Sequence, residues 1–249
     1  MSDTNDMSLT SHGTSRFATT HWSVVLAAGS PESTRYQKAL ETLCQMYWFP
    51  LYAYLRRHGY DAHAAADYTQ AFFTQMLDKD YLKKVKPKPG KFRSFLLTAL
   101  KHFVCNERDR EAALKRGGGK VAISLDFENA ESQYAIEPAE GLTPEKLFEK
   151  SWAMTLLERT MNRLGAELAE KGKQEVFDHL KTYLSAEPNS IPYREAAAKV
   201  DMTEVAVRVA VHRLRKRCRE ILRDEIAQTV AREEQIDDEI RRLFSALSS

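Results

Sequence analysis

The 249-residue sequence has few of the features that mark secreted, membrane-spanning or metal-binding proteins. Its three cysteines, Cys44, Cys105 and Cys218, lie far apart and form no C-x-x-C pair, which argues against a disulfide framework or a zinc ribbon. No apolar run approaches the length of a membrane span, and residues 1–19 lack the basic start and apolar core of a signal peptide. We therefore expect a cytoplasmic protein without membrane association, with a disordered polar tail over residues 1–19.

Catalytic and cofactor-binding patterns are also missing. The seven histidines are scattered without an H-E-x-x-H or similar metal-ligand spacing, and no G-x-S-x-G segment occurs. The glycines at 117–119 lack the spacing of a phosphate-binding loop. We expect no cofactor and no metal, and we predict that the protein is not an enzyme.

Helical periodicity runs through most of the sequence and predicts an all-α protein. The N-terminal half predicts three helices, over residues 39–57, 63–77 and 90–116. Pro50 lies inside the first of them and is expected to kink it or to begin a new helix. Residues 120–145 combine acids with Pro138 and Pro144 and show no sustained period, so they predict an extended acidic linker between two helical domains.

One short segment is densely basic. Residues 205–222, VAVRVAVHRLRKRCREIL, contain Glu220 as their single acid. On a helix, Val207, Val211 and Leu214 form an apolar stripe, and most of the basic residues lie on the other faces. A solvated helix face typically pairs its bases with acids three or four positions away. Since that pairing is nearly absent, we favour binding to a polyanion such as nucleic acid over a solvated face.

The residues before the basic segment complete a helix-turn-helix. Residues 191–200 predict a short helix, residues 201–203 form a tight break, and Thr203 can cap the next helix by accepting a backbone N–H bond. The small side chains of residues 196–198 allow the two helices to cross closely. An ordinary αα-hairpin fits the same lengths, but it does not need a basic outer face.

A second segment mixes aromatic and basic residues. In GKFRSFLLTALKHFVCNERDR, within residues 90–116, we assign Phe95 and Leu96 to packing. The basic side chains beside them suit a phosphate backbone or a splayed single strand. Composition alone supports a DNA surface and a purely structural helix equally.

Three segments in this order, ADYTQAFFTQML, GKFRSFLLTALKHFVCNERDR and YREAAAKVDMTEVAVRVAVHRLRKR, resemble regions 2 and 4 of bacterial sigma-70-family factors of the extracytoplasmic-function (ECF) group. The resemblance implies two helical domains, a region 2-like helical bundle and a region 4-like helix-turn-helix, joined by an acidic linker. The implied division is a tail over 1–19, a region 2-like domain over 20–116, a linker over 117–145, a region 4-like domain over 146–223 and an amphipathic extension over 224–249.

The resemblance also implies a role for each part. The region 2 helix would dock on core RNA polymerase through Asp67, Gln70 and Phe73. The next helix would bind the melted minus-10 element of the promoter through Lys91, Phe92, Arg93, Lys101, His102, Asn106 and Arg108. The helix-turn-helix would read the minus-35 element as duplex through Thr203, Glu204, Arg208, His212, Arg213, Arg215, Lys216 and Arg219. The implied protein is a promoter-specificity subunit, monomeric when free, whose partners are core RNA polymerase and promoter DNA.

The sequence departs from the family pattern in its docking helix. Alanines stand where acids are common in the family, which leaves Asp67 alone. Phosphorylation of Thr69 or Thr74 by a Ser/Thr kinase would add negative charge, although apolar contacts with polymerase would also suffice. His102 and Asn106 replace common family residues, so the sequence predicts no minus-10 preference.

The linker and the C-terminal extension each leave two interpretations open. Residues 120–145 either thread through the basic channel of polymerase, as the resemblance implies, or form a solvated tether. Residues 224–249 predict an amphipathic helix that packs on the chain itself or on a regulator such as an anti-sigma factor.

Two other functions fit the same sequence. A helix-turn-helix regulator would bind duplex DNA without core polymerase. A helical adaptor would use its basic helix on acidic protein surfaces. Association with core polymerase separates the first interpretation from both of these.

Overall fold

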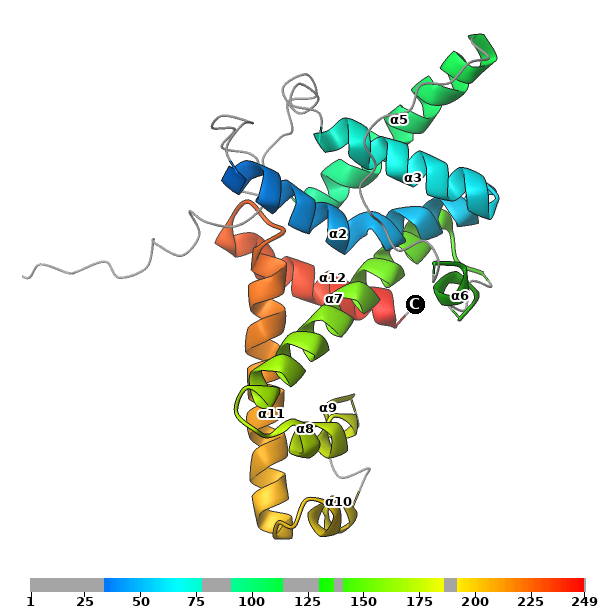
Figure 1. Cartoon of the computed structure of the whole chain (residues 1–249). Helices are drawn as coiled ribbons and strands as arrows, with labels where there is room; N and C mark the ends of the chain where they lie inside the picture. The colour runs from blue at the N-terminus through cyan, green and yellow to red at the C-terminus, as the bar shows by residue number, and fades with distance from the viewer. Residues whose placement is uncertain (1–33, 78–90, 114–129, 137–140, 186–191, 249) are drawn as a thin grey trace, which may run out of the picture.

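The computed structural model describes residues 34–77, 91–113, 130–136, 141–185 and 192–248 (Figure 1). Within these ranges every regular element is a helix, and an isolated antiparallel β-bridge joins Lys91 to Val230. The all-α prediction is therefore confirmed for the described residues. None of the helices in these ranges is both long and apolar enough to cross a membrane.

Helices α2, α3 and α5 supply much of a first hydrophobic core, and all three lie close to their predicted positions. Their bounds are Thr34–Arg57 for α2, Ala62–Leu77 for α3 and Phe92–Ala113 for α5. Leu43, Tyr47 and Leu51 of α2 are fully buried in this core. Helix α2 continues through Pro50, so no new helix begins there.

The long helix α7 (Pro144–Ala169) crosses α2 and brings Phe148 and Trp152 into the first core (Figure 1). Thr143 caps its start by accepting a hydrogen bond from the Lys146 backbone N–H at 3.3 Å. Pro144 suits the first turn, where a helix needs no N–H donor.

The chain ends in helix α12 (Ile236–Leu247), which follows the short 3-10 helix η2 (Glu233–Gln235). Ile236 and Leu243 are buried in the first core, against α7 and α11 (Glu204–Ala227). Of the two alternatives for the C-terminal stripe, packing on the chain itself is the one observed.

A second hydrophobic core forms where three short helices surround the N-terminal half of α11. These are α8 (Gln174–Leu180), α9 (Thr182–Ser185) and α10 (Tyr193–Lys199). The core contains Phe177, Val207 and Leu214 among its buried side chains. It gives α11 a fixed inner face, so the opposite face of the helix is left for solvent or a ligand.

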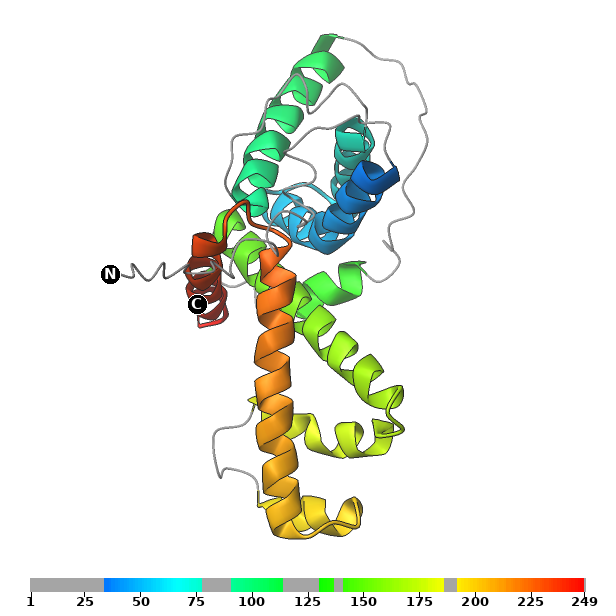
Figure 2. The same ribbon diagram turned by 90° about the vertical axis from the view of Figure 1, so that its left-hand side faces the viewer.

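Helices α7 and α11 contribute to both cores. On α7, Trp152 belongs to the first core and Leu164 to the second, while on α11 Val211 belongs to the second core and Ile226 to the first. Figures 1 and 2 show α11 running from α12 to the far end of the molecule, where α10 lies. The two cores therefore meet along α7 and α11, and the predicted boundary at residues 117–145 does not separate them.

A short helix, α6 (Ala130–Ile136), lies inside the segment that was predicted to be an extended linker. Its Glu131 accepts hydrogen bonds from Arg56 Nε at 2.7 Å, from Arg56 Nη2 at 3.1 Å and from the Tyr52 hydroxyl. The hydrogen bonds from Arg56 hold the pKa of the Glu131 carboxyl below its ordinary value. The prediction of an extended segment is thus wrong for residues 130–136, which fold onto α2.

Candidate nucleic-acid interface

The turn between α10 and α11 fixes how the basic helix begins. Thr203 Oγ1 accepts a hydrogen bond from the Ala206 backbone N–H at 3.2 Å, which is the predicted cap. The turn also contains Asp201 in the left-handed backbone region, with φ of 49°. Met202 N donates to the carbonyl of Ala197 at 3.1 Å, and the small buried side chain of Ala197 allows this close approach.

The solvent side of α11 is strongly basic. We call this surface the outer face of α11, and it consists of Arg208, His212, Arg213, Lys216 and Arg219, all exposed. Most of these residues are three or four positions apart, so they lie along one side of the helix. The side chains of the last four form no hydrogen bond or ion pair with any other described residue. Their charges therefore remain available for a ligand outside the described chain.

Arg208 is held in place by its neighbours. Its Nη2 donates to Glu204 Oε1 at 3.2 Å, and its guanidinium lies 5.5 Å from the centre of the Tyr193 ring. Tyr193 in turn stacks on Tyr183 of α9, with ring centres 5.3 Å apart. The aromatic part of this support could not be predicted from the sequence, because it depends on helices α9 and α10 meeting α11. Glu204 is accordingly a positioning group for Arg208 on the same helix.

Arg215 has a different surrounding from its basic neighbours. Its Nε and Nη2 donate to the backbone carbonyl of Tyr183 at 3.1 and 2.8 Å, and the side chain is half-buried. These donors connect α11 to α9. We therefore correct its predicted role in reading DNA bases and assign it to the structure of the helix-turn-helix.

Arg217 lies on the side of α11 that faces α7. It donates to both carboxylate oxygens of Glu167, at 2.8 and 2.7 Å, and to Glu220 at 3.0 Å. The hydrogen bonds from Arg217 hold the pKa of the Glu167 carboxyl below its ordinary value. This bidentate pair fixes the crossing of α7 and α11, and Arg217 does not belong to the outer face.

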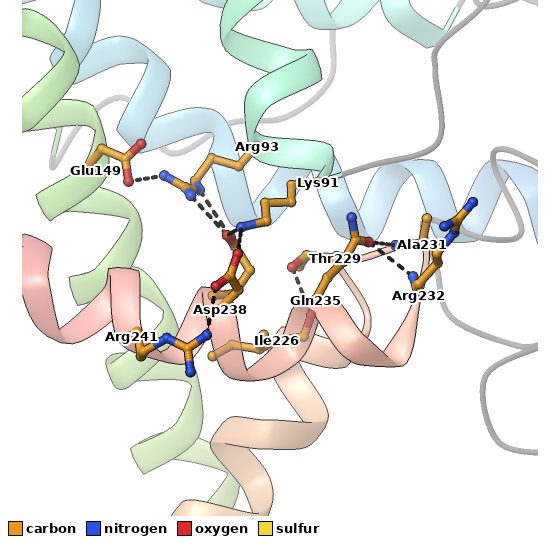
Figure 3. A network of polar contacts seen from close by, with 11 residues as sticks. Lys91, Arg93, Glu149, Ile226, Thr229, Ala231, Arg232, Gln235, Asp238 and Arg241 are labelled. Carbon is orange, nitrogen blue, oxygen red and sulfur yellow. Dashed lines mark hydrogen bonds and ion pairs between the residues drawn. The ribbon is translucent and has the colours of Figure 1, made fainter. Parts of the chain in front are cut away.

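At the start of α5 the predicted DNA-binding residues Lys91 and Arg93 point toward acidic side chains of α7 and α12 (Figure 3). Arg93 is 2% exposed, pairs with Glu149 and with Glu239 at 3.0 Å, and lies over the Trp152 ring at 4.5 Å. Glu239, on α12, is 1% exposed. Because a buried charge is stable only when it is paired and hydrogen-bonded, these contacts account for Arg93.

The two residues before Arg93 also make contacts within the protein. Lys91 pairs with Glu239 at 2.8 Å and with Asp238 at 3.3 Å. Phe92 is fully buried and meets the Tyr47 ring edge-on, with centres 5.1 Å apart. We correct the predicted minus-10 role of Phe92 and Arg93, because neither side chain reaches the surface in this conformation.

Further along α5 the candidate minus-10 residues are exposed. His102 and Asn106 face solvent, and so does Lys101, which pairs with Glu145 at 2.8 Å. The hydrogen bond from Lys101 holds the pKa of the Glu145 carboxyl below its ordinary value. Arg108 belongs to α5, but its side chain lies outside the described residues.

The candidate docking residues on α3, like the candidate residues on α5, include both exposed and buried side chains. Asp67 is exposed, with His63 Nε2 at 3.4 Å, and Gln70 is half-buried, whereas Phe73 is fully buried in the first core. We therefore correct the docking role of Phe73, which packs inside the bundle.

The two threonines that were candidates for phosphorylation both donate their hydroxyls to the backbone of α3. Thr69 Oγ1 is bonded to the carbonyl of Ala65 at 2.7 Å, and the residue is fully buried. Thr74 Oγ1 is bonded to the carbonyl of Gln70 at 2.9 Å and is half-buried. A kinase cannot reach Thr69 in this conformation, so the phosphorylation hypothesis is corrected for Thr69.

Metal binding has no support among the described residues, where no group of three or more His, Cys, Asp or Glu side chains could hold an ion. Comparison of the chain with protein-family models, with curated proteins and with solved structures gave no match. Among the described residues, the outer face of α11 is the strongest candidate site.

Proposed function

We propose that this chain is a promoter-specificity subunit of bacterial RNA polymerase, and that the outer face of α11 binds the duplex part of the promoter. The observation that carries the proposal is a capped helix-turn-helix whose second helix presents unpaired cations to solvent. A helix of this kind fits the major groove, with its first turns against base edges. The resemblance of the sequence to sigma regions 2 and 4 supports the polymerase-bound form of this function.

Electrostatics support DNA over other acidic partners. The net charge of the chain is only +2, and the outer face of α11 gathers five basic side chains on one side of a single helix. Closely spaced phosphates match closely spaced cations, and neutralising each phosphate releases counterions. Binding should therefore weaken steeply with salt. The logarithm of the binding constant should fall by about 0.9 per phosphate contacted for each tenfold rise in salt concentration.

The proposed contacts are narrower than the sequence implied. For the duplex they are Arg208, His212, Arg213, Lys216 and Arg219. For the melted minus-10 element they retain His102 and Asn106, which are exposed on α5. For polymerase they retain Asp67 and Gln70 on α3. Phe73, Phe92 and Arg93 are left out, because all three are buried.

Co-elution and duplex binding test the proposal together. We expect the full chain to co-elute with core polymerase, and we expect the joint Arg213→Ala and Lys216→Ala variant to lose duplex affinity and to show a shallower salt slope. Lys38→Ala is the matched control, because Lys38 is an exposed base on a different helix, α2, and does not belong to the outer face of α11. Equal losses in the control and in the double variant would exclude the outer face as the binding surface.

A second candidate function is that of a helix-turn-helix regulator that acts without polymerase. The burial of Phe73 favours it, since one of three implied docking residues is unavailable. Duplex binding without co-elution would select this alternative. Co-elution without duplex binding, or neither of the two, would leave an interaction protein as the explanation of the basic face.

A further inference from the structure

Two apolar side chains stand among the cations at the start of α11. Val205 is 71% exposed and Val209 is 44% exposed. The other large apolar side chains that are exposed in the described chain, Met154 and Phe244, lie on different helices. Single exposed apolar residues are ordinary, but these two lie one helical turn apart and form a small apolar patch on one face of the helix.

The pair does not stabilise the fold. Valine is a poorer helix former than alanine, and neither side chain belongs to a hydrophobic core. The inner side of the same turns is filled by Val207 and Val211, which are buried. The exposed valines therefore face whatever binds the outer face of α11.

From the exposure of Val205 and Val209 among the cations of α11, we infer that these two side chains read the 5-methyl groups of thymines in the major groove. This inference rests on the proposed binding of duplex DNA. Of the groups in the major groove, the thymine methyl is the apolar one, and apolar side chains recognise it by contact. The flanking cations complement the phosphates on either side of the groove. The charges and the valines therefore fit the same ligand, duplex DNA.

Helix position supports the assignment. Thr203 caps the helix two residues before Val205, so both valines lie in the first two turns, the part of a recognition helix that approaches base edges. Arg208 lies between them in sequence and is steadied by Glu204 and Tyr193. A positioned guanidinium and two methyl-bearing side chains can thus read neighbouring base pairs from one face.

The spacing limits which bases are read. Residues four apart on a helix are separated by about 6 Å along its axis. Successive base pairs are separated by about 3.4 Å along each strand. The two valines should therefore meet thymines that are one or two base steps apart, on the same strand or on opposite strands.

Replacement of thymine by deoxyuridine isolates the methyl group. The preferred duplex is first selected from a randomised pool by the full chain, alone and bound to core polymerase. Each thymine of the selected site is then replaced by deoxyuridine, and the affinity is measured for wild type, Val205→Ala, Val209→Ala and the double variant. We expect the wild type to lose about fourfold for each methyl that is read. The double variant should bind thymine and deoxyuridine duplexes equally.

Phe244→Ala is the matched control, since it removes an exposed apolar side chain from α12 and should keep the wild-type response to deoxyuridine. Thermal melting checks that the valine variants fold. A selected site without thymine, a wild type that ignores every replacement, or valine variants that retain the full response would each overturn the inference while leaving duplex binding intact. Failure of the chain to bind any duplex, alone or with polymerase, would instead overturn the proposed function and the inference with it.

Discussion

Basic residues at the start of α5 and along the outer face of α11 look alike in the sequence but lie in opposite surroundings. Lys91 and Arg93 are paired with acids of α12 and α7, in a network that is largely buried. On α11, Arg213 and Lys216 face solvent and have no ion pair within the described chain. The first group joins parts of the protein, and the second is free for a ligand.

The difference lies in where the neutralising acids come from. Arg93 and Glu239 are 146 residues apart in the chain, so no local charge pattern could show that they meet. Nearby pairs such as Glu204 and Arg208 are visible in the sequence, and they are exposed. A basic segment therefore identifies a binding surface only after the long-range acids are known.

Removal of Glu239 should give the largest effect on stability. Glu239→Ala leaves the buried Arg93 with Glu149 as its remaining acid, and we expect a loss of about 3 kcal/mol in the free energy of unfolding. Urea denaturation measures it. Asp238→Ala removes the neighbouring acid, which is half exposed, and should cost less than about 1 kcal/mol. Equal losses in the two variants would mean that the buried pair has no special role.

Neighbouring arginines of α11 should separate binding from folding. Arg213→Ala should weaken duplex binding by about 1 to 3 kcal/mol and leave the unfolding free energy unchanged. Arg215→Ala should instead lower the unfolding free energy by about 1 to 2 kcal/mol, because it removes two bonds to the Tyr183 carbonyl. Fluorescence anisotropy and urea denaturation give the two values. Loss of stability in the Arg213 variant would show that the outer face has a structural role.

Valines on the two sides of α11 give the same contrast between a buried structural side chain and an exposed one, here with uncharged residues. Val207→Ala should lower the unfolding free energy by about 2 kcal/mol, because Val207 is fully buried. Val205→Ala should change it by less than about 0.5 kcal/mol, since that side chain is exposed. Thermal and urea denaturation of both variants measure this difference. A destabilised Val205 variant would place that side chain in a contact that the structure does not show.

The smallest predicted effect concerns pH. The pKa of Glu167 is below its ordinary value of 4.5, so its pair with Arg217 stabilises the fold above that pH and is lost as pH falls through the lowered pKa. We expect less than about 1 kcal/mol, because Arg217 is 39% exposed and solvent screens the pair. Unfolding curves of wild type and Glu167→Gln between neutral pH and pH 3 should converge at the acid end. Curves that stay parallel would exclude this carboxyl as the titrating group.

Much of the fold followed from periodicity. The helices near residues 39–57, 63–77 and 90–116 were predictable, and so was the Thr203 cap, because each depends on residues close together in the chain. Helix α6 was missed because it is stabilised by Arg56 and Tyr52, more than 70 residues away. The packing of α7 across both cores was missed for the same reason.

The candidate site was predictable only in part. Alternation of apolar and basic residues identified the outer face of α11, since the inner stripe of Val207, Val211 and Leu214 is local information. It could not distinguish Arg215, whose partner is a backbone carbonyl of another helix. The family resemblance placed Phe92 at a DNA surface, whereas the structure buries that ring against Tyr47.

Promoter-dependent transcription measures whether this chain directs initiation. Core polymerase is combined with the full chain and a template that carries the duplex site selected by the chain, and the length and amount of transcript are measured. We expect a transcript of defined start with wild type and with Lys38→Ala, and a large loss of transcript with the joint Arg213→Ala and Lys216→Ala variant. No defined transcript with the wild-type chain, despite duplex binding, would contradict the claim that this protein directs initiation.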